Sequence, residues 1–161
     1  MQYLLDTNIC IFFLRGKLNL DEIIKQKGKE NCFVSEITVF ELRFGAENSE
    51  NPTKSNEAVD LFVSGISIIP IYGSIKKYAK EKVRLRKVGK PINDEFDLLI
   101  GATAVENKLI LVTDNGKDFE NIDGIIIENW FRNWTSSINN FIQIFSNLRF
   151  AILHFYKILY I

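Results

Sequence analysis

The apolar positions of the chain fall into short runs separated by longer amphipathic segments. Five runs are typical of buried strands: residues 2–5, 32–35, 67–71, 109–113 and 124–130. The segments between them have helical spacing and predict helices over residues 6–27 with a break near Gly16, 36–48, 53–64, 74–88 and 93–107. Strands that alternate with helices in this way predict an α/β domain built on a parallel sheet.

Residues 131–161 form a second apolar segment that does not continue this alternation. Its apolar side chains recur at alternating steps of four and three, at Phe141, Phe145, Leu148, Ile152, Phe155 and Leu159. Arg149, His154 and Lys157 interrupt the segment, so we do not expect a membrane span. We predict a domain over residues 1–130 and a helical extension over 131–161, which either packs on the domain or a dimer or has no selected function.

Composition and charge narrow the possible functions. The chain has 20 basic and 20 acidic residues, so any signal for a nucleic-acid or membrane partner must be local. Cys10 and Cys32 lie in apolar surroundings, as buried thiols in a reducing compartment do, and no signal segment opens the chain, so we expect a cytoplasmic protein. The one histidine is His154, so catalysis within residues 1–130 would depend on carboxylates, a metal ion or both.

Two acids occupy positions that invite a functional interpretation. Asp6 directly follows the first strand, at the edge where parallel sheets bind ligands, although helix capping alone would also explain it. Glu41 shares a helical stripe with Ile37, Phe40 and Phe44, so helical geometry turns it inward. A carboxylate buried there must be neutralised, paired with a basic residue or bound to a metal ion, and the stripe alone leaves these alternatives open.

Further acids follow later in the chain. Asp94 and Asp97 share a face near the start of a helix, where the helix dipole accounts readily for Asp94 and less well for Asp97, which adjoins an apolar run. After the fourth strand, Thr113 precedes a turn that contains Asp114 and Asp118. The residues alone do not choose between these last two acids.

These acids become more informative when they are considered together. Three or four carboxylates at one edge of a parallel sheet would repel one another and raise their pKa values unless a hard cation lies among them. Mg²⁺ or Mn²⁺ suits such a ligand set and keeps water within reach for chemistry. A site of this kind activates water and stabilises charge on a phosphoryl group, which predicts hydrolysis of phosphodiester bonds.

Four motifs in this order carry a family resemblance: "LLDTN", "SEITVFELRFGAE", "GKPINDEFDLLIGATA" and "LILVTDNGKDFENIDGIIIENW". Over residues 1 to about 130 the chain resembles a PIN-domain ribonuclease of the VapC toxin group. The resemblance implies a three-layer α/β/α fold around a parallel sheet of four or five strands. It also implies an endoribonuclease that depends on Mg²⁺ or Mn²⁺, a cognate antitoxin that inhibits it, and a homodimer.

The resemblance also assigns roles to residues. Asp6, Glu41 and Asp97 match the three principal acids of the metal site. Thr7, Asn8 and Thr113 are expected to be supporting polar groups. The wider family often has Asp at the position of Asn115, whereas this sequence has Asp114 before it and Asp118 after it; we prefer Asp118 as the fourth acid.

A basic segment lies just before the last two acidic motifs. Residues 76–90 contain eight basic residues and one acid. The basic stripe of the predicted helix lies opposite a face that carries Ile75, Ala79 and Leu85, and it consists of Lys76, Lys77, Lys80, Arg84 and Lys87. A Lys-rich face is usually only solvated, but beside a metal site it favours an RNA-binding groove. Structured RNA such as tRNA is what the family suggests as substrate. The alternative is a catalytically silent module that keeps the scaffold and binds RNA or protein.

Overall fold

The sheet has five strands, all parallel, in the computed structural model, which describes residues 1–17 and 19–130. The strands are β1 (Tyr3–Leu5), β2 (Cys32–Ser35), β3 (Ser67–Ile69), β4 (Ile110–Val112) and β5 (Ile127–Glu128), in the spatial order β3-β2-β1-β4-β5. The predicted parallel sheet is therefore confirmed. The helix expected over 131–161 lies outside the described residues.

Seven α-helices connect the strands within the described part. They are α1 (Thr7–Leu14), α2 (Leu20–Lys27), α3 (Glu36–Glu47), α4 (Pro52–Ser64), α5 (Ile75–Lys87), α6 (Glu95–Glu106) and α7 (Gly116–Phe119), with short 3₁₀ turns at Lys29–Asn31 and Tyr72–Ser74. The Ser35 hydroxyl accepts the Thr38 backbone N–H at 3.0 Å, and the Asp94 carboxylate accepts that of Phe96 at 2.8 Å. These caps satisfy backbone donors that would otherwise lack a partner. They explain why α3 and α6 begin where they do.

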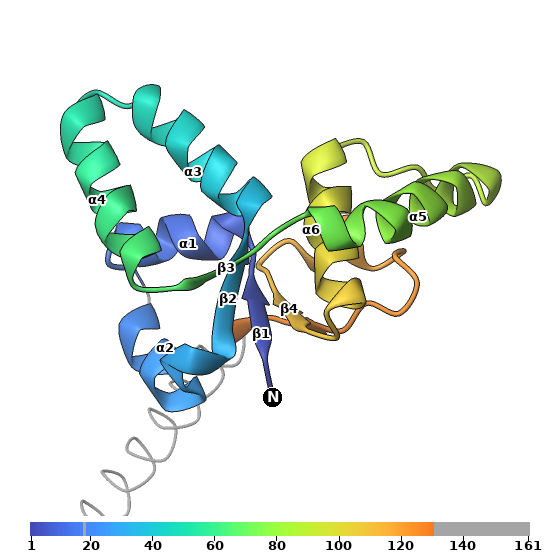
Figure 1. Cartoon of the computed structure of the whole chain (residues 1–161), viewed down its shortest axis with the longest axis horizontal. Helices are drawn as coiled ribbons and strands as arrows, with labels where there is room; N and C mark the ends of the chain where they lie inside the picture. Colours follow the sequence, from blue (N-terminus) through green and yellow to red (C-terminus); the bar gives the residue numbers. More distant parts are fainter. Residues whose placement is uncertain (18, 131–161) are drawn as a thin grey trace, which may run out of the picture. The chain divides into compact units, whose positions relative to one another are not determined.

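The helices lie on both sides of the sheet, with α1 to α4 on one side and α5 and α6 on the other (Figure 1). All three residues of β1 are buried, as expected for a strand covered on both faces. Leu4 of β1 and Leu111 of β4 belong to one buried cluster with Leu85 of α5 and Leu98 of α6. This packing holds the carboxyl ends of the central strands at one common edge.

Two helices are oriented differently from the prediction. On α3, Phe40 and Phe44 are 58% and 68% exposed, so the expected inward stripe is wrong for these two residues. The reason is that α3 buries the stripe of Thr38, Leu42 and Ala46 instead. Phe40 keeps an edge-on contact with Phe96 of α6, with ring centroids 5.5 Å apart.

Helix α5 is rotated relative to the expected face of Ile75, Ala79 and Leu85. Leu85 is buried, but Ile75 is 47% exposed, and Glu81 is buried in its place. Neighbouring groups that bind the Glu81 carboxylate, described below, make this burial possible. The polar stretch after β4, expected as a turn, forms the short helix α7, and β5 is shorter than predicted. In the described part of the chain, no helix is long and apolar enough to span a membrane.

Candidate active site

Strands β1 and β4 are neighbours at the point where the chain reverses the direction in which it adds strands to the sheet. From β1 the chain builds outward through β2 and β3 on one side, and it then returns to add β4 and β5 on the other. Open parallel sheets bind ligands at the carboxyl ends of the strands that flank such a switch point. Asp6 follows β1 and Thr113 follows β4, so these two residues meet at this edge.

Asp6 combines a structural role with a position in the site. It is 4% exposed, and its carboxylate accepts the Thr7 backbone N–H at 2.7 Å, which caps α1. The other carboxylate oxygen accepts the Thr113 hydroxyl at 2.7 Å. Burial raises the pKa of Asp6 above its usual value although both hydrogen bonds lower it. The capping explanation is therefore compatible with a role in the site.

The Thr113 side chain connects the two strand ends. It is fully buried, and besides donating to Asp6 its hydroxyl oxygen accepts the Asn8 side-chain amide at 3.1 Å and the Asn115 backbone N–H at 3.0 Å. A hydroxyl has one proton, and these two incoming donors direct it to Asp6. Thr113 and Asn8 thus fix the orientation of the Asp6 carboxylate.

Glu41 projects from α3 toward the same edge. Its carboxylate accepts the Thr7 hydroxyl at 2.5 Å. Burial raises the pKa of Glu41, and the charges of Asp6 and Asp94 raise it further. Among the described residues no basic side chain forms the salt bridge to Glu41 that was considered as an alternative.

The pKa of Asp97 is affected by several of the other acids. Burial is the main cause that raises its pKa to about 7, followed by the charges of Asp6, Asp94, Asp118 and Glu41. The fact that all four acids affect Asp97 places them around one region. Asp94 caps α6 and also influences both Glu41 and Asp97. The sequence places Asp94 on the same face as Asp97, but the helix dipole alone accounts for an acid at that position.

The structure distinguishes the two candidates for the fourth acid. Asp118, on α7, accepts the side-chain amide of Asn115, and its charge raises the pKa values of Asp6 and Asp97. Asp114 instead accepts the Asn129 amide at 2.9 Å, and its backbone N–H donates to Asn8. The charge of Asp118 thus acts on two of the other candidate acids, Asp6 and Asp97. The choice depends on α7, which the sequence pattern predicted as an irregular turn.

The donor set fits a hard divalent cation better than any internal partner. Within the described ranges, no ion pair involves Asp6, Glu41, Asp97 or Asp118. The described residues hold no group of three His, Cys, Asp or Glu side chains that are already close enough together to coordinate one cation. Carboxylate oxygens that repel one another and lack a basic partner are suitable ligands for Mg²⁺ or Mn²⁺.

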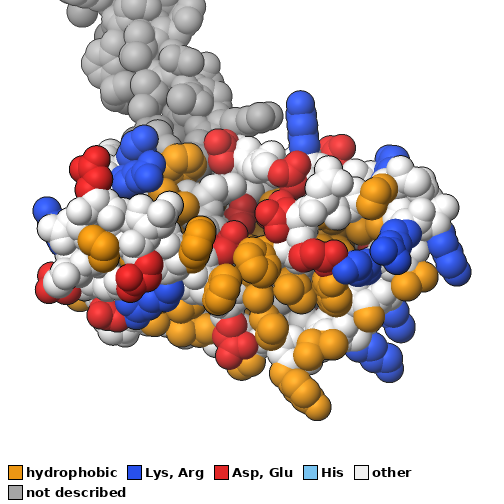
Figure 2. Space-filling view, turned by 90° about the horizontal axis from the view of Figure 1, so that it is seen from above, with side chains coloured by type: hydrophobic (Ala, Val, Ile, Leu, Met, Phe, Trp, Pro, Cys, Tyr) orange, Lys and Arg blue, Asp and Glu red, His pale blue; other side chains and the backbone are white. Residues whose placement is uncertain are grey.

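The surface around the site agrees with this description. Figure 2 looks onto the carboxyl edge of the sheet and shows acidic side chains gathered in the middle of that face, with hydrophobic side chains next to them. Lys and Arg side chains lie at the side of the same view. The face therefore presents a concentration of negative charge at its centre, and cations are among the side chains at its margin.

The basic stripe predicted for α5 divides into two groups. Lys77 donates to the Asp123 carbonyl at 3.0 Å and lies 3.5 Å from Glu81, and Arg84 binds the Glu81 carboxylate at 2.7 Å and the Asn121 carbonyl at 2.5 Å. These two cations are occupied by contacts within the chain. The other three, Lys76, Lys80 and Lys87, are exposed to solvent.

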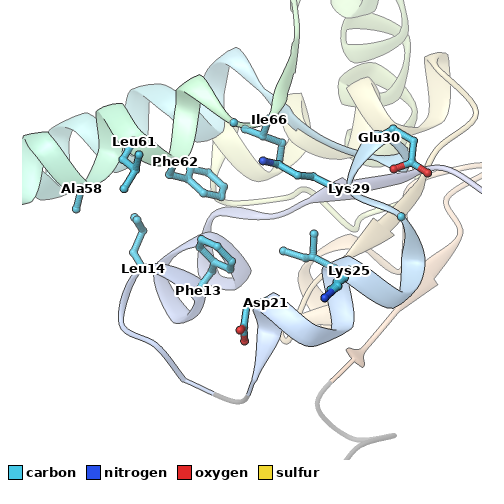
Figure 3. Close-up of a pocket in the computed structure, with 13 residues that line it drawn as sticks. Phe13, Leu14, Asp21, Lys25, Lys29, Glu30, Ala58, Leu61, Phe62 and Ile66 are labelled. Carbon is cyan, nitrogen blue, oxygen red and sulfur yellow. The ribbon is translucent and has the colours of Figure 1, made fainter.

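An apolar cavity elsewhere in the described residues does not contain the candidate site. It has a volume of about 860 Å³ and lies among α1, α2 and α4 (Figure 3). Its walls include Phe13, Leu14 and Phe62, and none of the candidate acids lines it. An apolar cavity is a poor binding site for a polyanion. A smaller polar groove of about 620 Å³ does contain Asp97 and Asp118.

Comparison with known proteins agrees with the geometry. The PIN domain family model matches residues 3–125. The chain is 31% identical to the tRNA(fMet)-specific endonuclease VapC of Shigella flexneri and 36% identical to ribonuclease VapC2 of Haemophilus influenzae; each match covers 81% of this chain and 98% of the relative. The DNA-bound VapBC structure from Salmonella typhimurium has a TM-score of 0.75 at 30% identity, covering 81% of this chain and 98% of the other. The chain therefore belongs to the PIN domain family and, within it, to the VapC group.

Proposed function

We propose that this protein is an endoribonuclease that depends on a divalent cation, Mg²⁺ or Mn²⁺, and acts as the toxin of a toxin–antitoxin pair. The observation that carries the proposal is the convergence of Asp6, Glu41, Asp97 and Asp118 at the switch point of the sheet without a basic partner in the described residues. Relatives named ribonucleases and tRNA endonucleases support RNA as the substrate, with tRNA as one plausible class.

The residues of the chain have distinct tasks in this proposal. A cation bound to the carboxylates supplies positive charge for the phosphate and activates water. Thr113 and Thr7 hold Asp6 and Glu41 in place through their hydroxyl groups. Asp97, with its pKa near 7, carries a proton part of the time at neutral pH until a cation favours its ionised form. No side chain has to act as a nucleophile.

The proposed partners follow from the neighbours and the surface. Similar solved structures are complexes of a VapC with its antitoxin, some bound to DNA, such as VapBC2 of Rickettsia felis, and we extend an antitoxin partner to this chain. The exposed Phe40 and Phe44 on α3 support a homodimer, because large apolar side chains gathered at a surface favour association. The free, buried Cys10 and Cys32 suit the cytoplasm, where the RNA substrate is found.

The direct test is cleavage of RNA by the purified protein. The parent should cleave tRNA when Mg²⁺ or Mn²⁺ is present and stop when EDTA is added. Asp6→Asn and Asp97→Asn should cleave at less than about a hundredth of the parent rate and should no longer inhibit growth when expressed. Circular dichroism should show that both variants are folded.

Two outcomes would contradict the proposal. Cleavage by purified Asp6→Asn at the parent rate would exclude the metal-site mechanism. RNA binding that does not respond to Mg²⁺, with no cleavage by the parent, would favour the silent binding module instead. Lys54→Gln, on the exposed surface of α4, is the matched control and should cleave like the parent.

A further inference from the structure

A polar groove extends from the acidic site along α7. Its walls come from the connection between α5 and α6 on one side and from α7 and the residues after it on the other. The lining includes Asp94, Asp97 and Asp118 of the acidic site together with two lysines, Lys90 and Lys117. Neither lysine belongs to the stripe on α5 that the sequence predicted for RNA binding. The groove therefore places the acids beside two lysines that lie outside the predicted basic stripe of α5.

Lys117 is the more informative of the two lysines. It is exposed, and it has no hydrogen bond or ion pair to any residue in 1–17 or 19–130, although Asp118 is its neighbour in the chain. Lys90 donates to the side-chain oxygen of Asn121 at 2.9 Å, and an ammonium group has further protons to donate. Both cations are thus available to an anion that enters the groove.

The groove wall after α7 is anchored to α5. Arg84 and Lys77 donate to the carbonyls of Asn121 and Asp123 at 2.5 and 3.0 Å, and the Asp123 backbone N–H donates to the buried Glu81 at 3.0 Å. These contacts hold the wall before any ligand arrives, which reduces the ordering cost of binding. Lys77 and Arg84 thus hold the wall in place and share their charge with Glu81.

The charges in the groove select the kind of ligand that fits it. Asp94, Asp97, Asp118 and Glu120 outnumber the two lysines, so a phosphate enters favourably only when a cation neutralises the acidic end. With the scissile phosphate at the acids, the neighbouring phosphates of the same strand are the anions within reach of the lysines. A continuous phosphodiester backbone satisfies both requirements, whereas a single phosphate satisfies only one.

We propose that this groove binds the RNA backbone beside the scissile phosphate, with Lys117 as the principal phosphate-binding residue and Lys90 as the second. This proposal rests on the function proposed above, since it assigns the path of the substrate of that same site. Lys76, Lys80 and Lys87 then contribute less to RNA binding than the two groove lysines.

The test measures RNA binding separately from cleavage. Asp6 does not line the groove, and the groove acids Asp97 and Asp118 remain to attract Mg²⁺ supplied at millimolar concentration. Asp6→Asn therefore provides a background in which the groove is intact and cleavage is expected to be lost. Affinity for a fluorescent single-stranded RNA is measured by anisotropy with Mg²⁺ over a range of salt. Adding Lys117→Gln should weaken binding about tenfold and reduce the slope of log affinity against log salt by about 0.7.

The controls separate charge, structure and the proposed function. Lys117→Arg in the same background should bind RNA within about twofold of the Asp6→Asn protein, because it keeps the charge. Lys54→Gln should change neither affinity nor slope. If Lys117→Gln binds RNA with unchanged affinity and slope, the groove proposal is wrong, whether or not the parent cleaves RNA. If the groove variants behave as expected and the parent does not cleave, the proposed function fails by itself.

Discussion

Two acids of this protein, the half-buried Asp97 and the buried Glu81, have opposite electrostatic surroundings. Around Asp97 the charges are those of other acids, and its pKa rises to about 7. Glu81 is only 3% exposed, and burial by itself would raise its pKa. Hydrogen bonds from Arg84 and the Asp123 backbone N–H, together with the charge of Lys77, outweigh burial and lower the pKa. A buried acid whose charge is neutralised by basic and N–H groups of the same chain stabilises the folded structure. An acid surrounded by other acids is stabilised in its ionised form only by a cation from outside the chain.

After the acids themselves, the largest effect on cleavage is expected from the hydroxyl that orients Asp6. Thr113→Val keeps the shape of the buried side chain but removes the donor to Asp6 and the acceptor for Asn8. Residues that orient metal ligands typically contribute about ten- to a hundredfold to activity or metal affinity. We expect a fall of that size either in the cleavage rate at saturating Mg²⁺ or in the Mg²⁺ affinity obtained from a titration of the cleavage rate. Unchanged cleavage in both assays would mean that Thr113 has only a packing role.

An intermediate effect is expected at the satisfied acid. Glu81→Gln weakens the contacts to Arg84 and Asp123 and should cost about 1–2 kcal/mol of unfolding free energy, as measured by urea denaturation. Asp97→Asn should not destabilise the protein in EDTA, because it removes a charge that its neighbours repel. An equal loss of stability in both variants would invalidate the contrast between the two acids.

The smallest effect is a difference in pH dependence. The pKa of Asp97 in the folded state lies above its usual 3.8. Between about pH 4 and about pH 7 the folded state therefore binds more protons than the unfolded state, and the contribution of this group to stability falls as pH rises through that range. The lowered pKa of Glu81 has the opposite sign, since its contribution is lost as pH falls through the folded value. Urea denaturation in EDTA should show a smaller loss between acidic and neutral pH for Asp97→Asn than for the parent. An identical pH profile would argue against a raised pKa.

Much of the fold follows from local pattern, and the details of the site do not. The strands were predictable because short apolar runs such as that around Leu4, which alternate with longer amphipathic segments, are typical of strands covered on both faces. Asp6 and Asp97 stood out because each adjoins such a run. The burial of Glu81 was not predictable, since it depends on backbone groups of Asn121 and Asp123, distant in the chain. The exposure of Phe40 likewise depends on which side of α3 meets its neighbours.

The choice between Asp114 and Asp118 shows the same limit. Both acids lie in a stretch whose Asn and Gly residues indicate a turn, but the stretch forms α7, and this helix turns Asp118 toward Asp6 and Asp97. Lys117 enters the groove for the same reason. Sequence reasoning favoured the lysines on α5 because they are numerous, whereas the position of one lysine on a short helix is a tertiary property.

The central claim is that the acids at the carboxyl edge of the sheet hold a divalent cation. A cation that binds only the folded state raises the melting temperature, by an amount that grows with its concentration relative to the dissociation constant. Thermal melting of the parent, Asp97→Asn and Glu81→Gln should therefore be compared in EDTA and in millimolar Mg²⁺ near neutral pH. Mg²⁺ should raise the melting temperature of the parent and of Glu81→Gln but not that of Asp97→Asn. A parent that does not respond to Mg²⁺, or an Asp97→Asn variant that responds equally, would contradict the proposed cation site.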